Sequence, residues 1–129
     1  MEKRKAYICS PLSAPTADEI HRNMEAARRY MRVVTEKLHC RAVAPHAFLP
    51  EFMNDQDMRE RELALAFGLA YLDTCDMLVI CGNRITQGML GEILHAANRG
   101  IPILWFREFH SPRSGNIGGI DFEEIKRWC

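Results

Sequence analysis

The residues in this chain best suited to chemistry lie in one short stretch, ITQGMLGE, which ends at Glu92. Gly88 lets a ligand approach the backbone closely, while Thr86 and Gln87 supply a hydroxyl and an amide. Free N–H groups at the start of the helix expected here suit a phosphate or a ribose. Glu92 falls in the first turn of that helix, where the helix dipole favours its ionised form.

An ionised glutamate at such a position has two interpretations. A carboxylate aimed into a cleft can attack an anomeric carbon, as in retaining glycosidases. A first-turn acid is also a common surface feature of ordinary helices, where it only suits the dipole. The residues of this stretch by themselves favour the surface interpretation, so the elements around them have to decide.

Short apolar segments alternate with helical patterns along the chain. Strands are expected at Lys5–Ser10, Arg41–Pro45, Asp76–Cys81 and Ile101–Phe106. Helices are expected from a Thr16 cap to about residue 39, over 58–75, and from about 88 to 99, before Gly100. This order predicts an α/β fold, a single-domain doubly wound parallel sheet of the flavodoxin or Rossmann-like kind. Ligands bind such sheets at the carboxyl ends of the strands, where the loops after the first three strands converge.

A length of 129 residues predicts one domain. Its core is expected over about residues 5–106. Residues 107–129 are expected to form a loop and a short C-terminal helix, with the stretch SGNIGG as a flexible connection.

Composition excludes several classes of function. Basic and acidic residues both number 17, and a zero net charge gives no case for binding nucleic acid or a membrane surface. No apolar run reaches membrane-spanning length, and the start lacks a signal peptide. Five cysteines, an odd number without a C-x-x-C pair, favour a reduced, cytoplasmic protein.

Several familiar motifs are absent. The cysteine and histidine spacing matches no metal site. The chain has no dinucleotide-binding glycine fingerprint, no P-loop and no nucleophile elbow, so we expect no cofactor.

The chain as a whole resembles a known superfamily. The segments AYICSPLS, CDMLVI and QGMLGEILHAANRGIPI, with the long first helix, are similar to the nucleoside 2-deoxyribosyltransferase superfamily. That group includes the 2'-deoxynucleoside 5'-phosphate N-hydrolases and several uncharacterised, often phage-associated families. The resemblance covers roughly residues 5–106 and is closest to one of those uncharacterised families. It implies that the protein acts on a nucleoside or nucleotide.

The resemblance also implies roles for particular residues. Glu92 matches the catalytic glutamate, which forms a covalent glycosyl intermediate, and Tyr7 matches the tyrosine that holds it. Thr86 takes the position where the transferases carry an acid and the phosphate hydrolases a serine, and its hydroxyl suits a phosphorylated ligand. Further ligand-binding residues are expected in the converging loops and at the helix starts: Ser10, Ser13, Asn23, His46, Arg84, Gln87 and Gly88.

One departure from the family pattern leaves the function open. The family's second acid, which helps to protonate the leaving base, is replaced here by Gly68, and the nearest other acids are Glu62, Asp73 and Asp76. Two hypotheses follow. The protein is an N-glycosidase or deoxyribosyltransferase, or it is a non-catalytic sensor or phage sponge that binds a nucleotide-derived signal. A phosphoribohydrolase of the lysine-decarboxylase-like fold is a weaker alternative, because its P-G-G-x-G-T run is missing.

The resemblance implies a homodimer or larger homo-oligomer, since relatives of this fold usually associate. Three apolar parts of the chain are candidates for the contact: the segment FLPEFM, the segment ILWF and the C-terminal tail.

Overall fold

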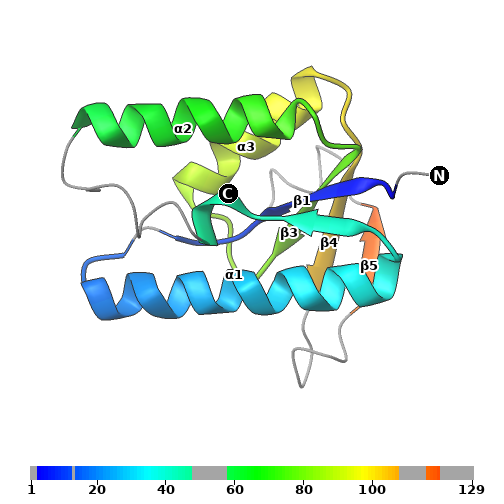
Figure 1. The fold of residues 1–129 in the computed structure, drawn as a ribbon, viewed down its shortest axis with the longest axis horizontal. Coiled ribbons are helices and arrows are strands. Elements are labelled where there is room, and N and C mark those ends of the chain that lie inside the picture. The colour runs from blue at the N-terminus through cyan, green and yellow to red at the C-terminus, as the bar shows by residue number, and fades with distance from the viewer. Residues whose placement is uncertain (1–2, 13, 48–57, 108–115, 120–129) are drawn as a thin grey trace.

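A five-stranded sheet in the order β2-β1-β3-β4-β5 forms the centre of the molecule in the computed structural model (Figure 1). The structure describes residues 3–12, 14–47, 58–107 and 116–119. The strands are β1 (Lys5–Cys9), β2 (Arg41–Val43), β3 (Met77–Cys81), β4 (Ile103–Arg107) and β5 (Asn116–Gly119). The first four strands are parallel, which confirms the predicted α/β fold with its doubly wound parallel sheet.

The fifth strand corrects the prediction for the stretch SGNIGG. Residues Asn116–Gly119 do not form a flexible connection but pair antiparallel with β4, with Phe106 opposite Ile117. The sequence does not reveal this strand, because a segment of Asn, Ile and two glycines lacks the alternation of apolar and polar residues that predicts a strand. The expected C-terminal helix lies outside the described residues.

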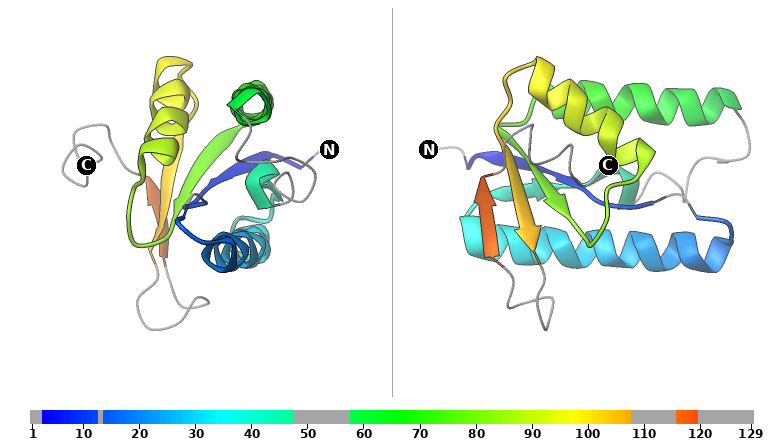
Figure 2. Two further views of the ribbon diagram at one scale, coloured as in Figure 1. Left: turned by 90° about the vertical axis from the view of Figure 1, so that its left-hand side faces the viewer. Right: turned by 180° about the vertical axis from the view of Figure 1, so that it is seen from behind.

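Helices cover both faces of the sheet (Figure 2). They are α1 (Ala17–Leu38), α2 (Met58–Leu72) and α3 (Gln87–Asn98), together with a short 3-10 helix, η1 (Pro45–Ala47). Thr16 caps α1 as expected, since its hydroxyl accepts a hydrogen bond from the Glu19 N–H at 3.2 Å. Gly100 follows α3 with a φ of 71°, the left-handed conformation that favours glycine at a helix end.

The alternation of side chains along β1 divides the core into two parts. Ala6 and Ile8 pack with α1 on one face of the sheet, in a cluster that also contains Val34. Tyr7 and Cys9 point to the other face, where the cluster includes residues of α2 and α3. Alternate residues of one strand therefore serve opposite sides of the sheet, and Tyr7 and Cys9 share the side of α3.

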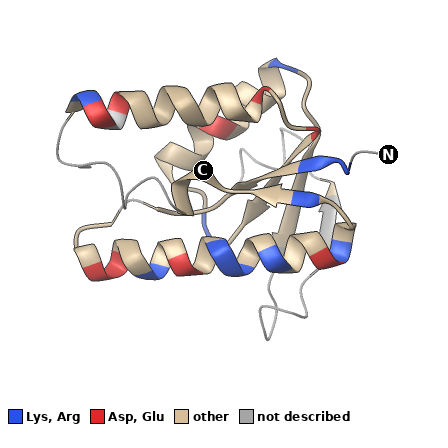
Figure 3. Cartoon of the chain, in the orientation of Figure 1, with Lys and Arg blue, Asp and Glu red and all other residues tan. Residues whose placement is uncertain are grey.

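Helix α2 is the least buried of the three helices. Its Gly68 and Leu72 are buried, but four large apolar side chains are exposed on its surface: Met58, Leu63, Leu65 and Phe67. Its charged residues lie in its first turns, Asp73 follows its end, and its middle has none (Figure 3). No helix in the described part of the chain is long and apolar enough to cross a membrane.

Candidate functional site

Three polar side chains meet at the carboxyl end of β1. The Tyr7 hydroxyl donates a hydrogen bond to the carboxylate of Glu92. The Cys9 thiol lies 3.9 Å from Oε1 of the same carboxylate. Tyr7 and Cys9 are two residues apart on one strand, so both reach α3 from the same face of the sheet. The predicted first-turn position of Glu92 was wrong, because α3 begins at Gln87, so that Glu92 lies in its second turn and no acid lies in the first. The structure therefore brings together two residues that the sequence singled out, Tyr7 and Glu92, and adds a third, Cys9.

The surroundings of Glu92 control its ionisation. Burial raises the pKa of Glu92 from its ordinary value of 4.5 to about 7, although the hydrogen bonds from Tyr7 and Cys9 lower it. Burial, and then the charge of Glu92, raises the pKa of Tyr7 and of Cys9 well above the usual range. Both neighbours therefore keep their protons at neutral pH and act as hydrogen-bond donors, while Glu92 is the group that titrates.

Gly68 of α2 faces the Tyr7 hydroxyl. A methyl group built on Gly68 would lie 3.1 Å from the Tyr7 hydroxyl oxygen, closer than ordinary van der Waals contact. An alanine at Gly68 would require the Tyr7 side chain or the helix to shift by a few tenths of an ångström. Gly68, where the sequence analysis expected a missing second acid, thus lies beside the Tyr7 hydroxyl.

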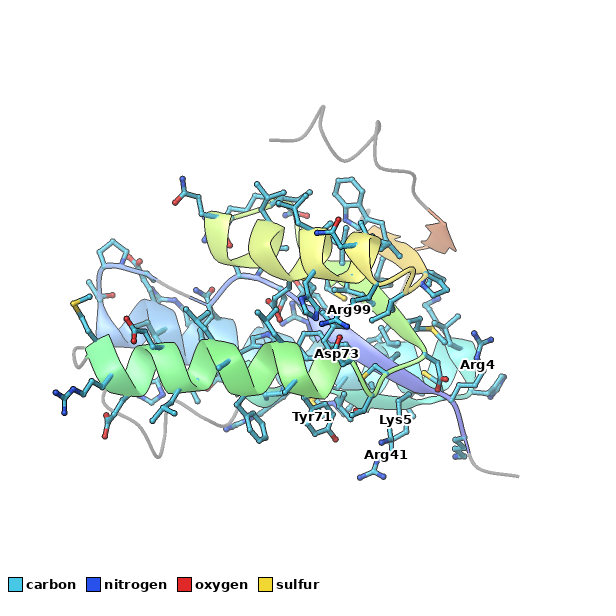
Figure 4. All side chains as sticks on the ribbon, turned by 90° about the horizontal axis from the view of Figure 1, so that it is seen from above. Arg4, Lys5, Arg41, Tyr71, Asp73 and Arg99 are labelled. Carbon is cyan, nitrogen blue, oxygen red and sulfur yellow. The ribbon has the colours of Figure 1, made fainter. Side chains whose placement is uncertain are left out.

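The other acids near this position have partners elsewhere or point to solvent. Asp73 pairs with His95 at 2.7 Å and lies 3.7 Å from Arg99, which ties the end of α2 to α3 (Figure 4). The Asp76 carboxylate accepts a hydrogen bond from the Lys5 N–H at 2.7 Å, which holds the start of β1. Glu62 is exposed on α2.

A second polar pair lies where β1 meets the loop after β2. Ser10 is 4% exposed, and its Oγ lies 2.8 Å from Nε2 of His46 in η1. Burial lowers the pKa of His46 to about 4, so the ring is neutral at neutral pH. Because η1 packs beside α1, this pair lies next to the other helix layer. The convergence of the loops after β1, β2 and β3 is observed, since Ser10 reaches η1 and Cys9 reaches α3.

Four of the predicted ligand-binding residues lie at or just before the N-terminus of α3: Arg84, Thr86, Gln87 and Gly88. Thr86 is the cap of α3: its hydroxyl accepts from the Met89 N–H at 3.3 Å, and its own N–H lies 3.4 Å from the Met89 sulfur. Gln87, Gly88 and Arg84 are exposed. A methyl group built on Gly88 would meet no described atom closer than the Thr86 hydroxyl oxygen at 4.0 Å, so the described residues leave the space beside it open.

Asn23 has a local partner. Its amide nitrogen donates to the Leu12 carbonyl at 2.9 Å and so tethers the loop between β1 and α1. Ser13, in the same loop, lies outside the described residues.

Cys9 is the residue that the sequence reasoning missed, because a cysteine in an apolar strand typically packs as a small hydrophobic residue. The i, i+2 spacing from Tyr7 was the signal that could have placed it beside Glu92. Among the described residues no group of three or more histidines, cysteines or acids is arranged to hold a metal ion. The four described cysteines are free and buried: Cys9, Cys40, Cys75 and Cys81.

Comparison with known proteins gives a family and a fold. A family model described as "Domain of unknown function (DUF7768)" matches residues 4–106. No curated protein matches the chain significantly. The chain is similar to the structure of a 2-deoxyribosyltransferase from the psychrotolerant bacterium Bacillus psychrosaccharolyticus, with a TM-score of 0.60 and 16% identity. The match covers 83% of this chain and 74% of that one. It confirms the nucleoside deoxyribosyltransferase-like fold.

Proposed function

This chain belongs to the DUF7768 family of domains of unknown function, and we propose that it acts on the N-glycosidic bond of a nucleoside or nucleotide, with Glu92 as the nucleophile. The observation that carries the proposal is that two hydrogen-bond donors, Tyr7 and Cys9, converge on the Glu92 carboxylate at the carboxyl end of β1. Ligands of doubly wound sheets bind at this end. The fold shared with a 2-deoxyribosyltransferase supports the same class of substrate.

In the proposed reaction an oxygen of ionised Glu92 attacks the anomeric carbon. The C–O bond to the carboxylate forms as the C–N bond to the base breaks, and the bonding electron pair leaves with the base. The base takes a proton from solvent. Water, or the nitrogen of a second base, then attacks the anomeric carbon and releases Glu92 as a carboxylate. Tyr7 keeps the carboxylate oriented through both steps.

Residues at the cleft edge are proposed to hold the sugar or a phosphate. The exposed N-terminus of α3, with Thr86, Gln87 and Gly88, offers N–H groups and the positive end of the helix dipole. Arg84 is exposed in the loop that leads to this helix and can pair with an anionic group. The proposed ligand is therefore a nucleoside with or without a 5'-phosphate. Ser10, Asn23 and His46 lie in the neighbouring loops and helix starts, and Ser13 remains a candidate from the sequence.

The test is release of free base. The protein is incubated with a panel of deoxynucleosides and their monophosphates, and the products are separated by chromatography. We expect base release from at least one member, with a loss of roughly 10³-fold or more in Glu92→Gln. Glu62→Gln, which changes an exposed acid on α2, is the matched control and should retain the wild-type rate. No release from the whole panel, or equal release by Glu92→Gln, contradicts the proposal.

Gly68 favours a second candidate function. Because the position beside Tyr7 and Glu92 holds no side chain, the described residues there supply no acid for the leaving base, and a general acid contributes about 10²–10⁴-fold in rate. The alternative is a protein that binds a nucleotide-derived signal without turnover. Thermal-shift screening against nucleotides, cyclic nucleotides and ADP-ribose-type ligands identifies a binder. A ligand recovered intact after long incubation supports binding, and a cleaved one supports the enzyme.

We also propose that the chain forms a homo-oligomer. The middle of α2 exposes Leu63, Leu65 and Phe67, and a helix that is apolar on all sides is usually covered. We propose that this uncharged surface packs against the same surface of a second copy of the chain, since a two-fold symmetric dimer uses the same patch on both subunits. The segment ILWF is a weaker candidate, because β4 lies between β3 and β5 and its Trp105 and Phe106 are buried within the chain. The segment FLPEFM and most of the tail lie outside the described residues.

A further inference from the structure

The thiol of Cys9 has two acceptors within reach. Its sulfur lies 3.7 Å from the backbone carbonyl oxygen of Met89 and 3.9 Å from Oε1 of Glu92. Both acceptors belong to the first turns of α3, and Cys9 itself is completely buried in β1. A thiol has a single hydrogen, so it donates to one of these oxygens at a time.

The charge of Glu92 decides between the two acceptors. A hydrogen bond to an ionised carboxylate is stronger than one to a neutral carbonyl, so the thiol favours Oε1 when Glu92 is an anion. When Glu92 is protonated or forms an ester, its oxygens become weaker acceptors and the Met89 carbonyl is preferred. The thiol therefore has a hydrogen-bond acceptor in either state.

We propose that Cys9 is a positioning residue for Glu92, whose thiol hydrogen moves between the Glu92 carboxylate and the Met89 carbonyl as the carboxylate gains and loses its charge. No covalent bond of Cys9 changes. Together with Tyr7, the thiol holds the free carboxylate as an anion, and it releases one oxygen when that oxygen bonds to carbon. The catalytic meaning of this movement rests on the proposed function, but the movement itself requires only the titration of Glu92.

A pH titration of the wild-type protein tests the movement directly. The S–H stretching band of Cys9 is measured by Raman difference spectroscopy between wild type and Cys9→Ala, because its frequency reports the strength of the acceptor. We expect the band to shift as the pH passes through the Glu92 titration near pH 7, and to stay constant in Glu92→Gln. A band that does not move in the wild type, or that moves equally in Glu92→Gln, overturns the proposal.

The second measurement is the pKa of Glu92 by NMR of protein labelled with carboxyl-¹³C glutamate. Removal of the donor in Cys9→Ala should raise this pKa by about half a pH unit, which corresponds to the lower end of the net free energy of one hydrogen bond. Cys9→Val, which fills the space without a donor, should give the same rise if the alanine variant folds poorly. Cys81→Ala is the matched control, because Cys81 is equally buried but packs on the α1 side of the sheet. It should leave the value unchanged.

The two proposals fail separately. If the pKa and the S–H band respond as expected but no nucleoside is cleaved, the positioning role of Cys9 stands and the enzymatic function falls. If base is released but Cys9→Ala and Cys9→Val titrate like the wild type, the enzymatic function stands and the role of Cys9 falls.

Discussion

At the scale of single residues, the carboxylate of Glu92 combines two opposing effects. Burial disfavours its charge and raises its pKa to about 7, while Tyr7 and Cys9 donate hydrogen bonds that favour the charge. A nucleophile must be ionised to attack, so the balance of these effects determines the pH at which Glu92 can react. The ionisation of this one group also affects the stability of the fold.

The rate of the proposed reaction should depend on pH through Glu92. We expect kcat/KM to rise with pH and to level off above an apparent pKa near 7, because only the anion attacks. Tyr7→Phe removes a hydrogen bond that lowers this pKa, so the rising limb should move up by about one to two pH units. Tyr71→Phe, on α2, is the control and should not move it. A limb that stays in place in Tyr7→Phe contradicts the assigned role.

Stability should depend on pH in the opposite direction. The folded pKa of Glu92 lies above the unfolded value of about 4.5, so the folded state binds the proton more tightly. Stability is therefore lost as the pH rises from about 4.5 to 7, by about 3 kcal/mol in total. Glu92→Gln removes this loss. We expect its Tm to exceed that of the wild type at pH 8 and to approach it at pH 4, measured by calorimetry. A wild type that is more stable than the variant at pH 8 speaks against the burial of this charge.

At the scale of elements, the site depends on how closely α2 and α3 approach β1. Helix α3 supplies Glu92, and β1 supplies two donors because residues two apart on a strand share a face. Helix α2 supplies no side chain at Gly68, and that absence allows the close contact with Tyr7. Two helical glycines differ here: Gly68 is buried against Tyr7, whereas Gly91 is exposed and a methyl group on it would meet no described atom within 4 Å.

These two glycines make a matched pair for mutation. Gly91→Ala should stabilise the protein by about 1 kcal/mol, because alanine is the better helix former. Gly68→Ala should lose that gain, since its methyl group would lie 3.1 Å from the Tyr7 hydroxyl and overpacking costs about 1–3 kcal/mol. Denaturant unfolding measures both values. We also expect the Glu92 pKa to change in Gly68→Ala, because Tyr7 must shift. Equal stabilisation by both substitutions is the result that counts against tight packing at Gly68.

At the scale of the whole molecule, the two faces of the sheet are covered unequally. Helix α1 buries a continuous apolar stripe that includes Met24, Val33 and Val34. Helix α2 lies beside α3 (Figure 1). Its Met58, Leu63, Leu65 and Phe67 side chains are exposed. An uncharged apolar surface of this kind is typical of a contact between subunits.

The proposed contact should be visible as a change in mass. Light scattering after size exclusion should give a multiple of the monomer mass for the wild type. Leu63→Glu combined with Phe67→Glu places two charges one helical turn apart on the exposed surface of α2, and we expect it to give monomers. His21→Glu, on the exposed side of α1, should leave the mass unchanged. A monomeric wild type at high concentration removes the proposal.

The sequence by itself determined the order of elements, the capping of α1 by Thr16, the left-handed Gly100 and the parallel core of the sheet. These features depend on local patterns: the period of apolar residues, the residue types at helix ends and the direction of successive strands. It also indicated Tyr7 and Glu92 through a resemblance, before any contact was known. Local patterns do not report what lies across the sheet, and the antiparallel pairing of Asn116–Gly119 was missed for that reason.

Only the tertiary structure decided how the side chains meet. The contact of Cys9 with Glu92 joins residues 83 positions apart, and the packing of Gly68 on Tyr7 joins different layers of the fold. The glycine that the sequence presented as a missing acid is, in the structure, the residue that lets α2 approach the tyrosine. The raised pKa of Glu92 is decided in the same way, because it comes from burial among elements that are distant in the chain.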